Sequence, residues 1–171
     1  MIKFVIINRA YIKDIYDNVD KEIMINHSTN GKETDRLNAL LLRMKYKGQS
    51  RVFAIPLSHA ISTSRNHDLT YFSTDMVDVV NKTTSGLYFK KCLPVNRNLY
   101  RIARASYGRF QRLAVVINNL ESKIVKSFET YLREYESKKK TDHKFNCCTD
   151  IDVIIEYMDK NYKNLPPNPQ N

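Results

Sequence analysis

The fold is decided by the stretch Leu40-Leu-Leu-Arg-Met-Lys-Tyr-Lys-Gly-Gln-Ser-Arg-Val-Phe-Ala-Ile-Pro-Leu-Ser58. Apolar and polar side chains alternate from Leu42 to Tyr46, Lys47-Gly48-Gln49 is a turn sequence, and a second apolar run extends from Val52 to Ile55. This pattern predicts a β-hairpin. Because proline has no N–H for the hydrogen-bond ladder, we expect Pro56 to end the second strand.

A polar cluster directly follows this hairpin. Junctions between strands and loops often carry binding and catalytic groups, because the rigid strand fixes their position at the surface. Ser58 and His59 are neighbours, so on an extended backbone their side chains point to opposite sides, and only a turn brings both to one substrate. The alternative interpretation is a polar junction without chemistry. The cluster consists of Ser58, His59, Ser62, Thr63, Ser64, Arg65 and His67.

Further strands are predicted on both sides of the hairpin, from short runs of β-branched and aromatic residues. A helical turn or short helix is expected at Tyr11–Tyr16, and the polar segment 17–36 is typical of a long loop. The predicted strands are Lys3–Ile7, Leu69–Ser73 and Leu87–Val95, the last introduced by Thr83-Thr-Ser-Gly86, whereas Met76–Val80 fits either a strand or a turn.

The apolar spacing changes to threes and fours from Asn98 onward, over about forty residues, which predicts helix. We expect a break at Asn118-Asn119 and therefore two helices. A last helix is predicted at Ile151–Tyr157, with Asp150 as a possible cap. Strands followed by helices indicate an α+β fold, a twisted antiparallel sheet with helices packed against it. We expect one domain over residues 1–164 and a flexible tail over 165–171.

The charge balance favours an anionic partner. The 171 residues contain 28 Lys and Arg against 18 Asp and Glu, a net charge of +10. No acidic residue lies between Arg97 and Leu120, so arginines in this segment lack the nearby partners of an ordinary solvated helix face. Phosphate binding explains this better, although a solvated face is the alternative. The four arginines expected on one helix face are Arg97, Arg101, Arg104 and Arg112.

Several classes of protein are disfavoured by what the sequence lacks. No phosphate-binding loop, dinucleotide fingerprint or HExxH motif is present, and no cofactor is predicted. His143 and Cys147 have helical spacing, but no second ligand pair accompanies them, so we predict no metal site. Three cysteines fit a reducing compartment, and no apolar run is long enough for a membrane span. We therefore expect a cytoplasmic protein.

The polar cluster after Pro56 has the groups that RNA cleavage without metal needs. The 2′-hydroxyl of the substrate is the nucleophile, and the protein supplies a base, an acid and a cation. His59 titrates in the right range to be the base or the acid. A serine hydroxyl would hydrogen-bond the phosphate. The possible cations are Lys13, Arg65 and Lys90, and the tyrosines placed to stack on bases are Tyr11, Tyr71 and Tyr88.

In motif order and spacing, the chain resembles the endoribonuclease toxins of type III toxin–antitoxin systems, the ToxN and AbiQ family of phage abortive-infection proteins. Each motif alone is weak. The likeness covers much of the chain and consists of Ala10-Tyr-Ile-Lys13, the hairpin leading into Phe53-Ala-Ile-Pro-Leu57, Gly86-Leu-Tyr-Phe-Lys90 before Leu93-Pro94, the long helix through Asn119 to Ile124, and Lys144-Phe-Asn-Cys147.

This resemblance implies a fold similar to other small ribonuclease toxins. It implies metal-independent cleavage of A-rich messages that leaves 2′,3′-cyclic phosphate and 5′-hydroxyl ends. It also implies that the protein processes a repeated antitoxin RNA, whose folded repeats, as in a pseudoknot, occupy a basic groove of the toxin. RNA-mediated or homo-oligomeric assembly is compatible with such a partner. The alternative function is a non-catalytic regulator that binds RNA or DNA.

The resemblance also implies residue roles. Tyr11 matches a substrate-contacting tyrosine, and Ser58-His59 falls on the pair that includes the essential hydroxyl. The sequence departs from the family at this pair, because His59 stands where serine or threonine is usual, and Ile61 stands where lysine is frequent. Either Ser58 or Ser62 therefore takes the hydroxyl role, and the cation comes from elsewhere.

Overall fold

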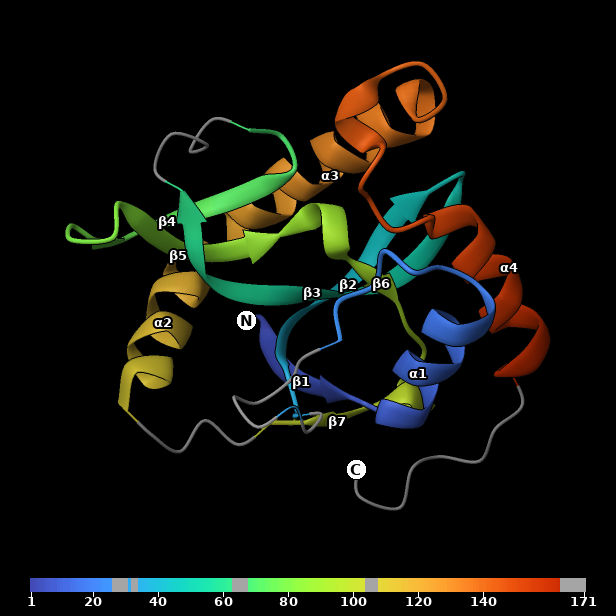
Figure 1. Cartoon of the computed structure of the whole chain (residues 1–171), viewed down its shortest axis with the longest axis horizontal. Helices are drawn as coiled ribbons and strands as arrows, with labels where there is room; N and C mark the ends of the chain where they lie inside the picture. The colour runs from blue at the N-terminus through green and yellow to red at the C-terminus, as the bar shows by residue number, and fades with distance from the viewer. Residues whose placement is uncertain (26–30, 32–33, 63–67, 104–107, 164–171) are drawn as a thin grey trace.

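The computed structural model describes residues 1–25, 31, 34–62, 68–103 and 108–163. The predicted tail over 165–171 lies outside these residues, as do Arg65 and Arg104. Within the described part, a large antiparallel sheet is combined with four helices, as the α+β prediction states (Figure 1).

The predicted hairpin is confirmed. It consists of β2 (Leu37–Tyr46) and β3 (Gln49–Ser62), paired through Leu40 opposite Ala54. Lys47 and Gly48 form the turn, and both adopt positive φ values of 47° and 74°. Such values suit the two central residues of a tight hairpin turn, which explains the glycine.

Pro56 does not end the second strand, so that prediction was wrong. Pro56 pairs with Asn38 at the end of the β2 ladder, and the next residue, Leu57, pairs with Leu87 of β5 (Thr83–Tyr88). The proline therefore lies where β3 changes its partner from β2 to β5. A missing N–H is tolerated at such a point because the ladder on one side is finishing.

The sheet order is β4-β5-β3-β2-β1-β7, with β6 paired to β3 as well, and its two ends do not close on each other. The remaining strands are β1 (Lys3–Ile7), β4 (Tyr71–Asp78), β6 (Leu93–Pro94) and β7 (Tyr100–Ile102). Strand β1 has the predicted bounds, and β4 includes most of the two segments predicted at 69–73 and 76–80.

The strand predicted at Leu87–Val95 is divided. Strand β5 ends at Tyr88, the 3₁₀ turn η2 (Phe89–Lys91) follows, and β6 begins at Leu93. Gly86 is inside β5 because a Cβ atom there would lie 2.0 Å from the Phe72 carbonyl oxygen of β4. The glycine thus permits close approach of two strands instead of marking a turn.

The four helices are α1 (Arg9–Asn18), α2 (Gly108–Asn119), α3 (Glu121–Lys138) and α4 (Ile151–Asn161). The break after Asn119 is confirmed, and the Asp150 side chain caps α4 by accepting a hydrogen bond from the Val153 N–H. The helix predicted from Asn98 is wrong over its first residues. The 3₁₀ turn η3 (Arg97–Leu99) and β7 occupy this segment, because β7 pairs with β1.

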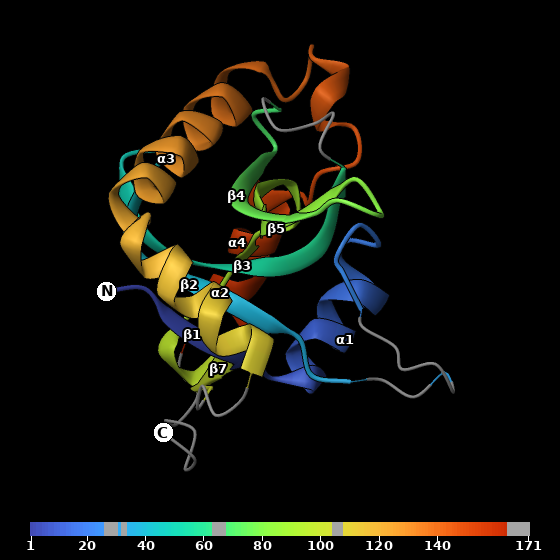
Figure 2. The same ribbon diagram turned by 90° about the vertical axis from the view of Figure 1, so that its left-hand side faces the viewer.

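Helices cover both faces of the sheet, and adjacent residues of one strand enter different cores (Figures 1 and 2). Phe4 packs in the core shared with α2 and α3, whereas Val5 packs in the core shared with α1 and α4. In the same way, Leu41 of β2 packs in the first of these cores and Leu40 packs in the second. Period-two alternation therefore supplies two apolar faces. Within the described residues, no helix has the length and apolarity required to cross a bilayer.

Candidate functional site

The point where β3 passes from β2 to β5 holds a cluster of hydroxyl groups. Tyr71 of β4 lies directly opposite Tyr88 of β5, and their rings meet edge to face with centroids 4.6 Å apart. The Ser58 hydroxyl on β3 forms a hydrogen bond with the Tyr88 hydroxyl. Burial and the neighbouring Tyr71 raise the pKa of Tyr88, while Ser58 and Lys90 act in the opposite direction. The Tyr88 hydroxyl is thus neutral at physiological pH.

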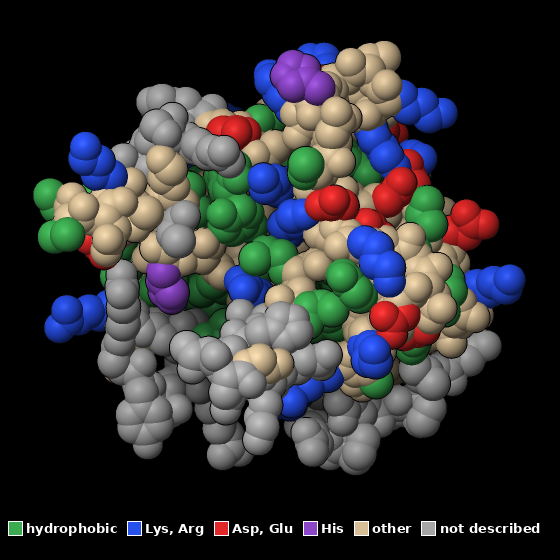
Figure 3. Space-filling model, in the orientation of Figure 1, with side chains coloured by type: hydrophobic (Ala, Val, Ile, Leu, Met, Phe, Trp, Pro, Cys, Tyr) green, Lys and Arg blue, Asp and Glu red, His purple; other side chains and the backbone are tan. Residues whose placement is uncertain are grey.

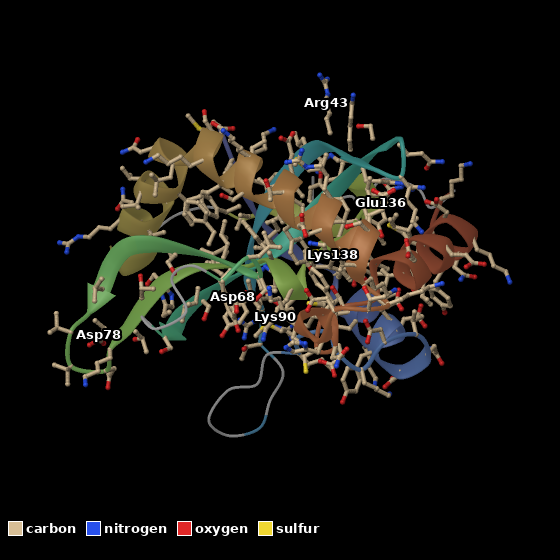
Figure 4. The ribbon with its side chains drawn as sticks, turned by 90° about the horizontal axis from the view of Figure 1, so that it is seen from above. Arg43, Asp68, Asp78, Lys90, Glu136 and Lys138 are labelled. Carbon is tan, nitrogen blue, oxygen red and sulfur yellow. The ribbon has the colours of Figure 1, made fainter. Side chains whose placement is uncertain are left out.

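Lys90, in the turn η2, adds a positive charge to this cluster. Its Nζ atom lies 5.0 Å from the ring centroid of Tyr71 and 5.9 Å from that of Tyr88, within the range of cation–π attraction. Its backbone N–H donates to the Thr70 carbonyl oxygen at 3.1 Å, and the Asp68 carboxylate accepts from the Thr70 hydroxyl at 2.8 Å. Figure 4 shows Lys90 and Asp68 close together, far from Asp78 at the tip of β4–β5.

Arg36 supplies a second cation, which the sequence reasoning missed. Its Nη1 atom donates to the Leu57 carbonyl oxygen at 3.2 Å, next to Ser58. Burial lowers the pKa of Arg36, and the Tyr88 phenol raises it. The contact with Leu57, the residue before Ser58, brings the guanidinium near the hydroxyl cluster. No signal in the sequence could have found Arg36, because the register shift between Leu41 and Met44 decides which residue of β3 it meets.

We call Arg36, Ser58, Tyr71, Tyr88 and Lys90 the Ser58 cluster. It combines two cations, a serine hydroxyl and two phenols contributed by β3, β4, β5, η2 and the segment before β2. Figure 3 shows Lys and Arg side chains among hydrophobic ones near the end of β5. Such a set of donors can bind a phosphate and stabilise additional negative charge on it.

His59 lies on the other face of β3. Its Nδ1 atom is 3.0 Å from the Ser85 Oγ atom, whereas Ser58 contacts Tyr88. Residues 85 and 88 of β5 point to opposite faces, because side chains alternate along a strand. The predicted strand-to-loop junction is therefore incorrect at this point, since β3 continues through both residues and separates them. The strand carries a bulge after Ser58, and Ser62 lies at its end, opposite Thr83.

Tyr11, for which the resemblance implies contact with substrate, is a buried residue of α1. It is 1% exposed, its hydroxyl donates to the Pro94 carbonyl oxygen at 3.0 Å, and its ring contacts Tyr162. Burial, with neighbouring Tyr162 and acidic groups, raises its pKa far above the usual range. A side chain in this position stabilises the packing of α1, and contact of Tyr11 with substrate stays a prediction.

The predicted arginine face is also corrected, because Arg97 and Arg101 precede the helix that carries Arg112. Arg97 lies over the Tyr100 ring at 5.4 Å, and Arg101 forms an ion pair with Asp35 at 2.8 Å, so a residue distant in sequence supplies its acidic partner. Arg112 is exposed on α2. Lys13 is exposed on α1 and pairs with Asp17 at 2.8 Å.

A cavity of about 410 Å³ adjoins the Ser58 cluster between β4 and α3. Tyr71 belongs to both. The cavity mixes aromatic rings with polar groups, including the Ser73 hydroxyl, which is buried and has no hydrogen-bond partner among the residues that the structure describes. Its lining residues are Asp68, Leu69, Tyr71, Phe72, Ser73, Phe89, Lys126, Ser127 and Thr130. Among the side chains that the structure describes, no group of three or more His, Cys, Asp or Glu residues is arranged to hold a metal ion.

Comparison with known proteins finds likeness in fold and not in sequence. Neither a protein-family model nor a curated protein sequence matches the chain. Among solved structures, AbiQ, a lactococcal anti-phage endoribonuclease of a type III toxin–antitoxin system, is similar with a TM-score of 0.70 and 10% identity. The match covers 96% of this chain and 99% of AbiQ.

Two further structures share the fold. One comes from a bacterial type III toxin–antitoxin system in which a non-coding RNA pseudoknot selectively inhibits the toxin; its TM-score is 0.68 at 17% identity, over 96% of this chain and 99% of that one. The other comes from a bacterial antiviral system regulated by a processed non-coding RNA, with a TM-score of 0.65 at 14% identity, over 95% and 98%. The fold expected from the family resemblance is thus confirmed.

Proposed function

We propose that this chain is an endoribonuclease toxin of a type III toxin–antitoxin system, active in abortive infection against phage. The observation that carries the proposal is the Ser58 cluster. It brings a hydroxyl and two cations together on the fold of three similar proteins, one of which is an anti-phage endoribonuclease. Ser58 is one of the two serines that the family resemblance offers for the hydroxyl role, and Ser62 is the other.

The proposed reaction is attack of a substrate 2′-hydroxyl on the adjacent phosphorus, with departure of the 5′-oxygen. The proton that the 2′-hydroxyl loses passes to solvent, and the departing 5′-oxygen takes up a proton from solvent. Ser58 donates a hydrogen bond to the phosphate, and Arg36 and Lys90 stabilise the negative charge that grows on it. The hydrogen bond between Ser58 and Tyr88 in the free protein would orient the serine hydroxyl for this contact. Because His59 lies on the other face, we assign the rate enhancement to charge stabilisation and positioning, without a histidine base.

RNA is the proposed partner in two roles, as substrate and as inhibitor. The net charge of +10 favours both. We propose that A-rich messages are substrates and that a repeated antitoxin RNA, folded as a pseudoknot, is processed and then retained in the groove. Lys13, Arg97 and Arg112 carry exposed charge for phosphate contacts, and the cavity beside Tyr71 offers rings for a base. RNA-linked or homo-oligomeric assembly belongs to the same proposal.

The test is incubation of the purified protein with A-rich RNA in EDTA, followed by analysis of the ends. The proposal predicts 2′,3′-cyclic phosphate and 5′-hydroxyl products, and no cutting at a site whose ribose is replaced by deoxyribose. Cutting that requires a divalent ion would contradict the mechanism. RNA binding without any cutting would instead favour the non-catalytic regulator.

A further inference from the structure

Asp35 is held between two arginines from distant parts of the chain. Its Oδ1 atom accepts from Arg9 Nε at 2.7 Å, and its Oδ2 atom accepts from Arg101 Nη2 at 2.8 Å. Arg9 opens α1, and Arg101 lies in β7, opposite Ile6 of β1. One carboxylate therefore connects the segment before β2 to α1 and to the edge strand of the sheet.

Arg36, the residue after Asp35, is the one that enters the Ser58 cluster. Its backbone is fixed on its other side as well, because the buried Asn38 side chain donates to the Arg36 carbonyl oxygen at 2.9 Å. The guanidinium then reaches the Leu57 carbonyl oxygen. Asp35 and Arg36 are thus both held in place by hydrogen bonds, and together these contacts set the direction in which the Arg36 side chain points.

The exposed fractions of the side chains support a positional role over a role in stability. Asp35 is 32% exposed, Arg101 38% and Arg9 55%, so each pair alone contributes little to the free energy of unfolding. Both guanidiniums are also engaged with the same carboxylate, so an RNA phosphate would have to compete with Asp35 for them. An arginine that binds phosphate directly would instead have its guanidinium open to the RNA.

We propose that Asp35 is a positioning residue for Arg36, and that Arg9 and Arg101 act by holding Asp35 instead of binding RNA. The placement of Arg36 follows from the contacts alone, whereas its effect on the rate rests on the proposed ribonuclease function. Misplacement of a charge-stabilising group by a fraction of an ångström lowers the rate of the chemical step without weakening substrate binding to the same degree.

The test compares Asp35→Asn with Asp17→Asn. Asp17 is a matched control, because it also forms ion pairs with two basic side chains, Lys13 and Lys21. It lies on α1, away from the Ser58 cluster. The first measurement needs no activity: the Nε–H signal of Arg36 in nitrogen-resolved NMR spectra of the RNA-free protein, assigned by its loss in Arg36→Lys. We expect this signal to shift or broaden in Asp35→Asn and to stay unchanged in Asp17→Asn.

The second measurement is kinetic. Asp35→Asn should lower kcat about tenfold with KM within about twofold, and Asp35→Glu should recover part of the loss. If Asp35→Asn fails to fold, Arg101→Lys, which keeps the charge but loses the planar fork, replaces it with the same expected pattern. If the wild type cuts no RNA, the proposed function fails while the NMR comparison still decides the positioning claim.

An unchanged Arg36 signal in Asp35→Asn would overturn the inference. So would a change confined to KM, accompanied in Arg101→Gln by a decrease of about one in the slope of log K against log salt, because that result identifies Arg101 as a direct phosphate contact.

Discussion

The two faces of β3 differ sharply at adjacent residues. On one face Ser58 meets Tyr88 and, through it, Tyr71 and Lys90, with Arg36 beside them. On the other face His59 is exposed and contacts the neutral Ser85 hydroxyl. The residue with the most familiar catalytic chemistry therefore lies on the face opposite Ser58. In a continuous strand, position along the chain counts for less than the face on which a side chain stands.

The largest expected effect comes from Gly86→Ala, which disturbs the strands that carry both faces. The new Cβ would lie 2.0 Å from the Phe72 carbonyl oxygen, so β4 and β5 must separate. We expect a loss of about 3 kcal/mol in the free energy of unfolding and a decrease of roughly 6–12 °C in Tm. Calorimetry measures this. Ser85→Ala, one residue away, is the control and should change Tm by only about a third as much.

Removing the charge of Lys90 tests whether the face of β3 that carries Ser58 determines the cleavage rate. Lys90→Met should lower the cleavage rate about a hundredfold, because a cation next to the phosphate is lost, while the long apolar stem is kept. Single-turnover cleavage of RNA measures the effect. The matched control is Lys91→Met, since Lys91 pairs with Glu22 at 2.6 Å instead of facing the tyrosines. Equal losses in both variants would mean that general charge, and not the Ser58 cluster, determines the rate.

A smaller effect is expected from Tyr88→Phe, which keeps the ring but removes the hydroxyl that is hydrogen-bonded to Ser58. The serine then samples other rotamers, and we expect a loss of about tenfold in kcat with little change in KM. Tyr157→Phe serves as the control, because its hydroxyl contacts Asp14 at a distance from the cluster. A wild-type rate in Tyr88→Phe would show that Ser58 needs no such fixing.

The smallest effect concerns pH. A histidine base would give the cleavage rate a step near pH 6.5, the usual pKa of imidazole. Because His59 lies on the face opposite Ser58, we expect the rates of wild type and His59→Ala to follow the same curve between about pH 5.5 and 7.5. If the wild type shows a step near pH 6.5 that His59→Ala lacks, His59 takes part in catalysis.

Local sequence signals predicted the elements whose stability is local. The hairpin, β1, the break after Asn119 and the Asp150 cap each depend on residues close together in the chain. The segment from Arg97 to Ile102 has helical spacing but forms the turn η3 and the strand β7, because pairing of β7 with β1 and burial of Leu99 and Tyr100 override that spacing. No local pattern reveals such a partner.

The candidate site was predictable in part for the same reason. Ser58, Tyr71, Tyr88 and Lys90 were singled out from the sequence, and the structure brings them together. Their grouping depends on the pairing of β3, β4 and β5, which the sequence does not display. Arg36 ends a polar segment and has no motif of its own, and Arg101 meets Asp35 across 66 positions. Contacts that depend on tertiary pairing remain outside local reasoning.

The most direct test of the account compares the single-turnover cleavage rates of Ser58→Ala and His59→Ala on one RNA, with binding measured in parallel. The account predicts a fall of roughly 10²- to 10³-fold for Ser58→Ala with binding retained, and a change within about threefold for His59→Ala. A large loss in His59→Ala together with near-normal cutting by Ser58→Ala would contradict it and would place the chemistry on the other face of the strand.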